Sequence, residues 1–147
     1  MSAELEERTF IFARDVRAFC RKLKWDIINI EDIKQLTKSS GSVGANYIEA
    51  NENLGEADLR MRIWISRKEA KESIRWLRLV NIEAEKNELE TERNRLIDEA
   101  DQLRRIFSAI LLKLGKRGKD AWLDIGHWTL VIGFFLVTGF CTLDFQS

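Results

Sequence analysis

Few residues of this 147-residue chain have the type and spacing that catalysis requires. Its single histidine, His127, lies in an apolar stretch near the C-terminus, and no Glu-x-x-His pair of the kind that holds a di-iron centre is present. The two cysteines, Cys20 and Cys141, match no metal-binding or redox spacing, and we interpret Cys20 as a small core residue. We therefore expect no catalytic residues, no metal and no cofactor, and we interpret the protein as a non-enzyme.

Two other patterns contain some of the side chains that a ligand-binding site needs, but neither contains all of them. Three glutamates, Glu49, Glu69 and Glu72, could bind a metal ion through their carboxylate oxygens, but we interpret them as parts of a structural polar network. The stretch GSVGAN, residues 41–46, has the small residues of a phosphate-binding loop. However, no Lys-Ser or Lys-Thr pair follows it and no strand precedes it. Neither pattern therefore predicts a ligand.

The composition is that of a helical protein with one main domain. The chain contains no proline, 33% of its residues are charged, and its formal net charge is zero. The charges are unevenly placed, because residues 60–78 are mainly basic and residues 83–101 mainly acidic. The cysteine usage fits a reducing compartment, and we expect a cytoplasmic protein.

Apolar and small residues recur at steps of three and four in four segments, which is the spacing of one helix face. The second stripe, over residues 33–54, runs without a break through two glycines, so we expect residues 39–46 to be helix rather than loop. The fourth stripe repeats every seven residues, as in a helix bundle. The predicted core residues are Phe12, Val16, Phe19, Leu23, Ile33, Leu36, Ser40, Val43, Tyr47, Ala50, Leu54, Leu59, Ile63, Ser66, Ala70, Ser73, Leu77, Val80, Leu89, Leu96, Ala100, Leu103, Phe107, Ile110 and Leu114.

Short connections separate the predicted helices. They fall near residues 25–30, at Gly55 and near residues 84–88, and short connections make successive helices antiparallel. Gly55 is predicted to cap the C-terminus of the second helix. The predicted fold is all-α: an up-down-up-down antiparallel four-helix bundle over residues 1–119, with an apolar C-terminal extension over residues 120–147.

Polar residues form a second stripe beside the apolar one on the predicted second helix. Gly41 and Gly44 leave the backbone bare there, so a neighbouring helix can approach closely. A buried polar group without a partner costs about 1–3 kcal/mol, so we hypothesise that Asn46 and Glu49 meet polar residues of the third helix, such as Lys68, and fix its register. The predicted helix–helix polar network comprises Ser39, Ser42, Asn46, Glu49, Arg67, Glu69 and Glu72.

Three long stretches resemble one bacterial protein family. They are QLTKSSGSVGANYIEANE (residues 35–52), RIWISRKEAKESIRWLRL (residues 62–79) and ERTFIFARDVRAFCRKL (residues 7–23). They resemble the four-helix-bundle proteins called 23S rRNA intervening-sequence proteins, over roughly residues 7–114. The resemblance implies an up-down bundle that assembles into a cyclic pentamer. A related branch, the accessory protein of diversity-generating retroelements, is a basic pentamer that binds a reverse transcriptase and nucleic acid, whereas this chain is neutral.

Basic residues crowd the predicted first and third helices. One interpretation is a solvated face, paired with acidic residues of the fourth helix or of a neighbouring subunit. The other is a surface that contacts the phosphates of RNA or DNA with little sequence preference. Trp64 and Trp76 favour packing in the core or between subunits over base stacking. The candidate nucleic-acid contacts are Arg14, Arg17, Arg21, Arg60, Arg62, Arg67, Lys68, Lys71, Arg75 and Arg78.

The C-terminal extension departs from the pattern of the bundle. Its run from Ile125 to Leu143 contains no charged Asp, Glu, Lys or Arg and is long enough to span a bilayer, and basic residues 116–119 precede it. Its glycines, threonines and β-branched residues also suit a segment that packs on the bundle or in the oligomer. Membrane association through this extension therefore remains an alternative to a purely cytoplasmic protein.

From the sequence we expect an oligomeric scaffold or interaction module rather than an enzyme. The expected partner is further copies of the same chain, five in all by the resemblance, with another protein as a further candidate. The alternative is a nucleic-acid-binding accessory protein that uses the basic surfaces of the first and third helices.

Overall fold

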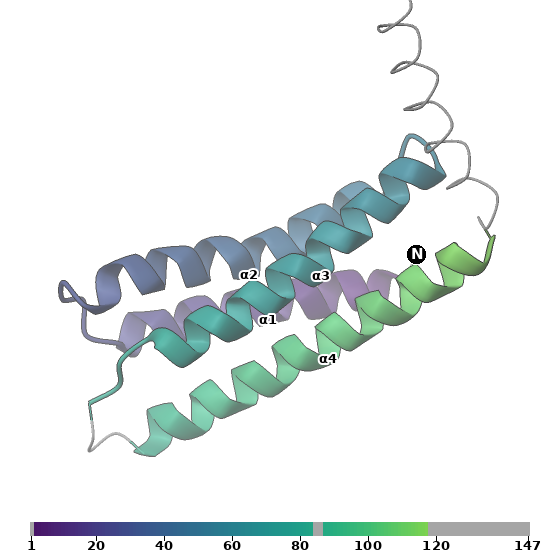
Figure 1. Ribbon diagram of the computed structural model, residues 1–147. Helices are drawn as coiled ribbons and strands as arrows, with labels where there is room; N and C mark the ends of the chain where they lie inside the picture. The colour runs from purple at the N-terminus through teal and green to yellow at the C-terminus, as the bar shows by residue number, and fades with distance from the viewer. Residues whose placement is uncertain (1, 84–86, 118–147) are drawn as a thin grey trace, which may run out of the picture. The chain divides into compact units, whose positions relative to one another are not determined.

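The computed structural model describes residues 2–83 and 87–117, and these form four α-helices (Figure 1). The chain divides into two units, Met1–Leu112 and Lys113–Ser147, and the packing described here is that of the first. The predicted boundary at residue 119 and the apolar extension lie outside the described residues. The helices are α1 (Ala3–Lys22), α2 (Asn29–Asn51), α3 (Glu56–Leu79) and α4 (Asn87–Arg117).

Contacts between helix ends show how the helices run. The Ser2 backbone amide, just before α1, donates to the Tyr47 hydroxyl near the end of α2, at 3.1 Å. At the other end of α1, Lys22 Nζ lies 2.7 Å from a carboxylate oxygen of Glu92 in the first turns of α4. Both pairs join the start of one helix to the end of another, so α1 runs antiparallel to α2 and to α4. The predicted four-helix bundle is confirmed.

All four helices contribute to one hydrophobic core. Phe12, Leu36 and Leu77 each have 1% or less of their surface exposed. Tyr47 of α2 packs on Phe107 of α4 with ring centroids 5.8 Å apart. Burying each such side chain contributes about 1.5–3 kcal/mol, which makes this core the main source of stability.

The predicted core stripes agree closely with the observed burial. Within residues 2–112, every predicted core residue is buried or packs against the core, with one exception. The exception is Leu54, which is 96% exposed because α2 ends at Asn51 and the turn carries Leu54 outward.

The α1–α2 connection is held by side-chain hydrogen bonds. Asp26 Oδ1 accepts from the backbone amides of Ile28 and Asn29 at 3.0 and 3.1 Å, which satisfies amide groups at the start of α2. The buried Asn29 side chain donates to the carbonyls of Lys24 and Asn81 and accepts from the Asn81 amide at 2.7 Å. This one residue therefore ties the α1–α2 loop to the α3–α4 loop.

The α2–α3 turn differs from the prediction at Gly55. Gly55 was predicted to cap the end of α2, but Glu52 follows the last residue of that helix, and Gly55 instead precedes α3. Its φ of 142° is a conformation that L side chains rarely adopt, so glycine is required to direct the chain into α3.

Candidate interaction surface on α1 and α2

Residues 39–46 are helical, as predicted, and their glycines face α1. A Cβ atom added at Gly44 would lie 3.0 Å from Thr9 Oγ1 and 3.4 Å from Thr9 Cβ. Thr9 is buried and its hydroxyl donates to the Glu6 carbonyl at 2.7 Å, so it has little freedom to move away. At Gly41 the nearest atom is Arg17 Nη2 at 3.1 Å, which is the end of a flexible side chain. Gly44 is therefore the position on α2 where a side chain would collide with α1.

The serine side of the same stretch faces α3. The hydroxyls of Ser39 and Ser73 are 3.0 Å apart and both are buried. Each hydroxyl also has a carbonyl of its own helix within reach: Leu36 for Ser39, at 3.2 Å, and Glu69 for Ser73, at 2.9 Å. A hydroxyl both donates and accepts, so the pair satisfies its hydrogen bonds inside the helix contact. The sequence placed Ser73 in the core stripe and did not identify it as the partner of Ser39.

The rest of the predicted polar network has different contacts from those expected. Asn46 donates to the Ser42 carbonyl of its own helix at 2.9 Å, which is a common arrangement for short polar side chains. Glu49 does reach α3, but it pairs with Arg62, which also contacts Asp58. None of these contacts involves the residues of α3 that were predicted as partners, and Glu49 links α2 to α3 through Arg62 instead.

The predicted α3 members of the network pair with one another. Lys68 Nζ lies 3.1 Å from Glu72 and 3.7 Å from Glu69. Burial, followed by the negative charge of Glu72, raises the pKa of the Glu69 carboxyl, whose side chain is 15% exposed. The hydrogen bond to Glu72 raises the pKa of Lys68. Arg67 is half-buried on the same helix and takes part in none of these contacts.

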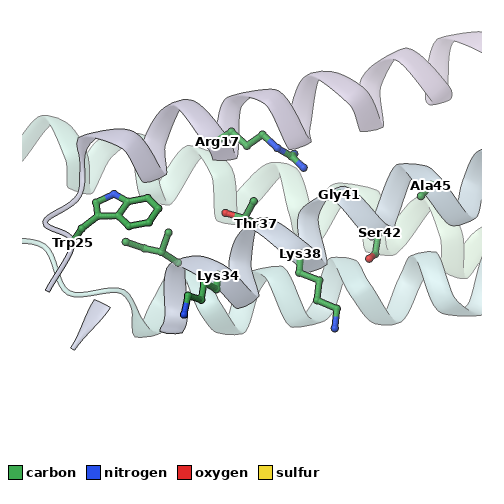
Figure 2. Close-up of a pocket in the computed structure, with 9 residues that line it drawn as sticks. Arg17, Trp25, Lys34, Thr37, Lys38, Gly41, Ser42 and Ala45 are labelled. Atoms are coloured by element: carbon green, nitrogen blue, oxygen red, sulfur yellow. The ribbon is translucent and has the colours of Figure 1, made fainter. Parts of the chain in front are cut away.

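A groove runs along the α1–α2 contact, and we call it the α1–α2 groove. Its first part, the Phe10 section, has a volume of about 730 Å³. Its second part, the Trp25 pocket, has a volume of about 580 Å³ and is drawn in Figure 2. The two parts share Arg17, Gly41 and Ala45. The glycines therefore form part of the groove as well as part of the helix contact.

The Phe10 section presents apolar side chains to solvent. Phe10 of α1 is 61% exposed and Ile48 of α2 is 46% exposed. Ala13 and Ala45 add to the apolar lining. The section is also lined by polar and charged residues: Glu6, Glu7, Thr9, Arg14 and Arg17. Such a surface can bind apolar groups that carry charges at their edge.

The Trp25 pocket is apolar at its base and basic at its rim. The buried side chain of Ile33 lines the pocket with Thr37 and Gly41. Three cations also line it: Arg17 from α1 with Lys34 and Lys38 from α2 (Figure 2). None of the described residues that line the pocket is a carboxylate, although Lys34 Nζ lies 3.7 Å from Glu31 Oε2 beside it. The Trp25 ring is 58% exposed, yet its indole nitrogen donates to the Cys20 carbonyl at 3.2 Å. The aromatic surface is thus held in place.

Cys20 lies beneath this surface and is unsuited to reaction. Its thiol is buried, with Thr37 Oγ1 3.9 Å from the sulfur. Burial raises the pKa of the thiol, which disfavours the nucleophilic thiolate. This position agrees with the interpretation of Cys20 as a core residue.

The candidate nucleic-acid contacts lie on two helices, α1 and α3. Arg14 and Arg17 border the α1–α2 groove, and Arg21 is exposed near the end of α1. Arg60 and Arg62 are half-buried near the start of α3. The exposed cations that do align form the α3 stripe, spaced at three, four and three residues: Lys68, Lys71, Arg75 and Arg78.

The α3 stripe continues toward the N-terminus of α3 with exposed apolar residues, Met61 and Trp64. Trp76, in contrast, is half-buried against the core, and Arg75 Cζ lies 5.7 Å from its ring centroid. The packing interpretation of Trp76 therefore agrees with the structure.

Some acidic residues of α4 pair with basic residues of α1, as in the Arg8–Glu99 contact at 2.7 Å.

Two searches found nothing: no family model matches the chain, and no curated protein matches it. Among solved structures, the chain is similar to a protein of unknown function from the S23 ribosomal protein family of Bacteroides thetaiotaomicron. The two are 22% identical, with a TM-score of 0.58, and the match covers 72% of this chain and 96% of that one. This chain shares that protein's fold. At this identity the likeness supports the four-helix-bundle architecture and no more.

The described part of the chain contains neither a membrane-spanning helix nor a cluster of metal ligands. Across residues 2–83 and 87–117, no helix combines the length and apolarity needed to cross a membrane. The run from Ile125 to Leu143 lies outside those residues. The same residues contain no group of three or more His, Cys, Asp or Glu side chains placed to hold a metal ion.

Proposed function

We propose that the protein is a non-enzymatic, self-associating four-helix-bundle scaffold, and that its copies meet at the α1–α2 groove. The observation that supports this most strongly is the exposed apolar lining of the groove, Phe10 and Ile48 above all. Contiguous exposed apolar surface marks sites of protein association. The family resemblance adds five as the expected number of copies.

The groove also has the shape that helix association requires. Gly41 and Ala45 have small or no side chains there, so an incoming segment can approach the backbone of α2 beside Gly44, which Thr9 covers. Removing the lining from water favours association by about 25 cal/mol for each Å² of apolar surface. A scaffold of this kind needs no catalytic group.

Sedimentation velocity of the full chain tests this function. We expect the wild-type protein to sediment as an oligomer and Ile48→Glu, which places a carboxylate in the groove, to sediment as a smaller species. Met61→Glu is the matched control, because Met61 is 56% exposed on α3 and outside the groove. A monomeric wild-type protein would refute the proposal, as would dissociation by Met61→Glu but not by Ile48→Glu.

Nucleic-acid binding through the α3 stripe is the second candidate function. Its support is the alignment of four exposed cations, three of which, Lys71, Arg75 and Arg78, make no salt bridge within the described residues. An assembly of several copies would repeat this stripe. Binding should show little sequence preference and weaken steeply between about 50 and 200 mM salt.

Fluorescence anisotropy with single-stranded and duplex oligonucleotides distinguishes the second function from the first. Lys71→Glu with Arg78→Glu should abolish binding and leave the sedimentation of the protein unchanged. If the wild-type protein forms no complex at about 50 mM salt, nucleic-acid binding is excluded.

A further inference from the structure

We propose that the Trp25 pocket of one copy receives the α2–α3 turn of a second copy. This inference rests on the proposed self-association and names the two surfaces that meet. The turn, residues 52–56, supplies an exposed leucine between two carboxylates, and the pocket supplies an apolar base within a basic rim.

The turn displays its leucine in a fixed conformation. Leu54 is 96% exposed, yet its backbone amide donates to Asp58 Oδ2 at 3.2 Å. Asn53 accepts from the Gly55 amide at 3.1 Å and donates to the Ala50 carbonyl at 3.0 Å. An apolar side chain held outward by a rigid turn loses little conformational entropy on binding, which is the condition for an effective anchor.

The charges of the two surfaces are complementary. Glu52 and Glu56 flank Leu54 and are exposed, and no lysine or arginine occurs between residues 39 and 59. The pocket has the opposite composition, with cations and no carboxylate among its lining residues. Complementary charges of this kind select the partner and its orientation.

The shape of the pocket suits a branched aliphatic side chain. The lining includes the Trp25 ring, the buried side chain of Ile33 and the bare backbone at Gly41, and these form its apolar base. Leu54 would pack there on the face of the indole ring. The rim lysines, Lys34 and Lys38, would then lie close to the two carboxylates of the turn.

A chain cannot place its turn in its own pocket. Lys38 lines the pocket, whereas the turn begins after Asn51, and the helical residues between them span about 20 Å at 1.5 Å per residue. The contact must therefore join two copies through unlike surfaces. Each copy has one turn and one pocket, so such contacts continue from copy to copy. They form a ring if the rotation between copies closes, and an open filament if it does not.

A mixing experiment with two full-length variants tests the proposal by native mass spectrometry. Leu54→Asp disables the turn and leaves the pocket intact. Lys34→Glu with Lys38→Glu disables the pocket and leaves the turn intact. Each variant alone should fall to the 17.2 kDa of one chain, and an equimolar mixture should form a 1:1 dimer, because only one productive contact remains.

Controls separate this inference from the proposed function. Lys71→Glu with Arg78→Glu makes the same charge change elsewhere and should keep the wild-type mass, and circular dichroism should show unchanged helicity in all variants. If the wild type is an oligomer but either disabled variant assembles normally, or the mixture stays monomeric, the turn–pocket contact is wrong while self-association stands. If the wild type is monomeric, both are wrong.

Discussion

Helix α2 contacts α1 with one side and α3 with the other, and the two contacts use small residues for different reasons. Toward α1, Gly44 is small because the side chain of Thr9 occupies the space where a Cβ would lie. Toward α3, Ser39 is small because its hydroxyl must reach the hydroxyl of Ser73 at 3.0 Å. The same sequence stretch thus supplies steric clearance on one side and hydrogen bonding on the other.

The two contacts of α2 also differ in how exposed they are to solvent. The contact between α2 and α3 is closed, with both serines buried. The contact between α1 and α2 leaves a groove above the glycines, and exposed Phe10 and Trp25 lie along it. The side of α2 that uses glycine is therefore the one that remains available to a partner.

Gly44→Val should have the largest effect on stability. The branched side chain would clash with Thr9, and overpacking of this kind costs about 1–3 kcal/mol in the free energy of unfolding. Ala45→Val is the control, since Ala45 is exposed and the change introduces the same β-branched residue one position on. Urea denaturation measures both, and equal losses would show that steric contact with α1 is not the cause.

Ser73→Ala should destabilise the protein by about 1 kcal/mol, because it removes the hydrogen bond to Ser39 across the α2–α3 contact. Ser66→Ala is the matched control: Ser66 is also buried on α3, and within the described residues its hydroxyl has no hydrogen-bond partner. Ser66→Ala should leave the free energy of unfolding unchanged or raise it.

A double-mutant cycle shows whether the loss of stability comes from the hydrogen bond between Ser39 and Ser73. Ser39→Ala and Ser73→Ala should show a coupling energy of about 0.5 kcal/mol or more when combined. Additive losses would mean that each serine acts only through the carbonyl of its own helix.

Gly41→Ala should stabilise the protein, in contrast to Gly44→Val. Alanine is better than glycine in a helix interior by up to about 1 kcal/mol, and the nearest atom to the new Cβ is the mobile end of Arg17. The midpoint of urea denaturation should rise. A fall would show that Arg17 cannot move and that both glycines are needed for clearance.

The smallest expected effect is the contribution of Glu69, on α3, to the pH dependence of stability. Burial raises the pKa of its carboxyl in the folded protein above the unfolded value of about 4.3. The folded state therefore keeps its proton to higher pH, and stability falls as pH rises from the unfolded pKa through the folded one. Glu69→Gln should remove this part of the pH dependence, and urea denaturation of both proteins at pH 4 and pH 7 measures it.

Much of the fold was predictable because burial follows helical periodicity. The stripe from Ile33 to Ala50 was predicted as helix despite its glycines, and the structure confirms it. Periodicity also counted Ser66 and Ser73 as core residues, but it could not show that only Ser73 has a partner on α2. That information depends on the distance between helices, which a single sequence does not contain.

The Trp25 pocket was not predicted at all. Its residues come from α1, the α1–α2 loop and α2, and the loop interrupts the apolar pattern that guided the prediction. One signal was available: Trp25, Ile27 and Ile28 place large apolar residues where no helix face buries them, and all three are exposed. Leu54 gives the same signal in the α2–α3 turn.

The molar mass of the full-length protein in solution, measured by light scattering, tests the proposed scaffold most directly. A mass several times the 17.2 kDa of one chain, and five times that value if the family resemblance extends to assembly, is the expected result. A mass of one chain at every concentration would contradict self-association and leave the α1–α2 groove without its proposed partner.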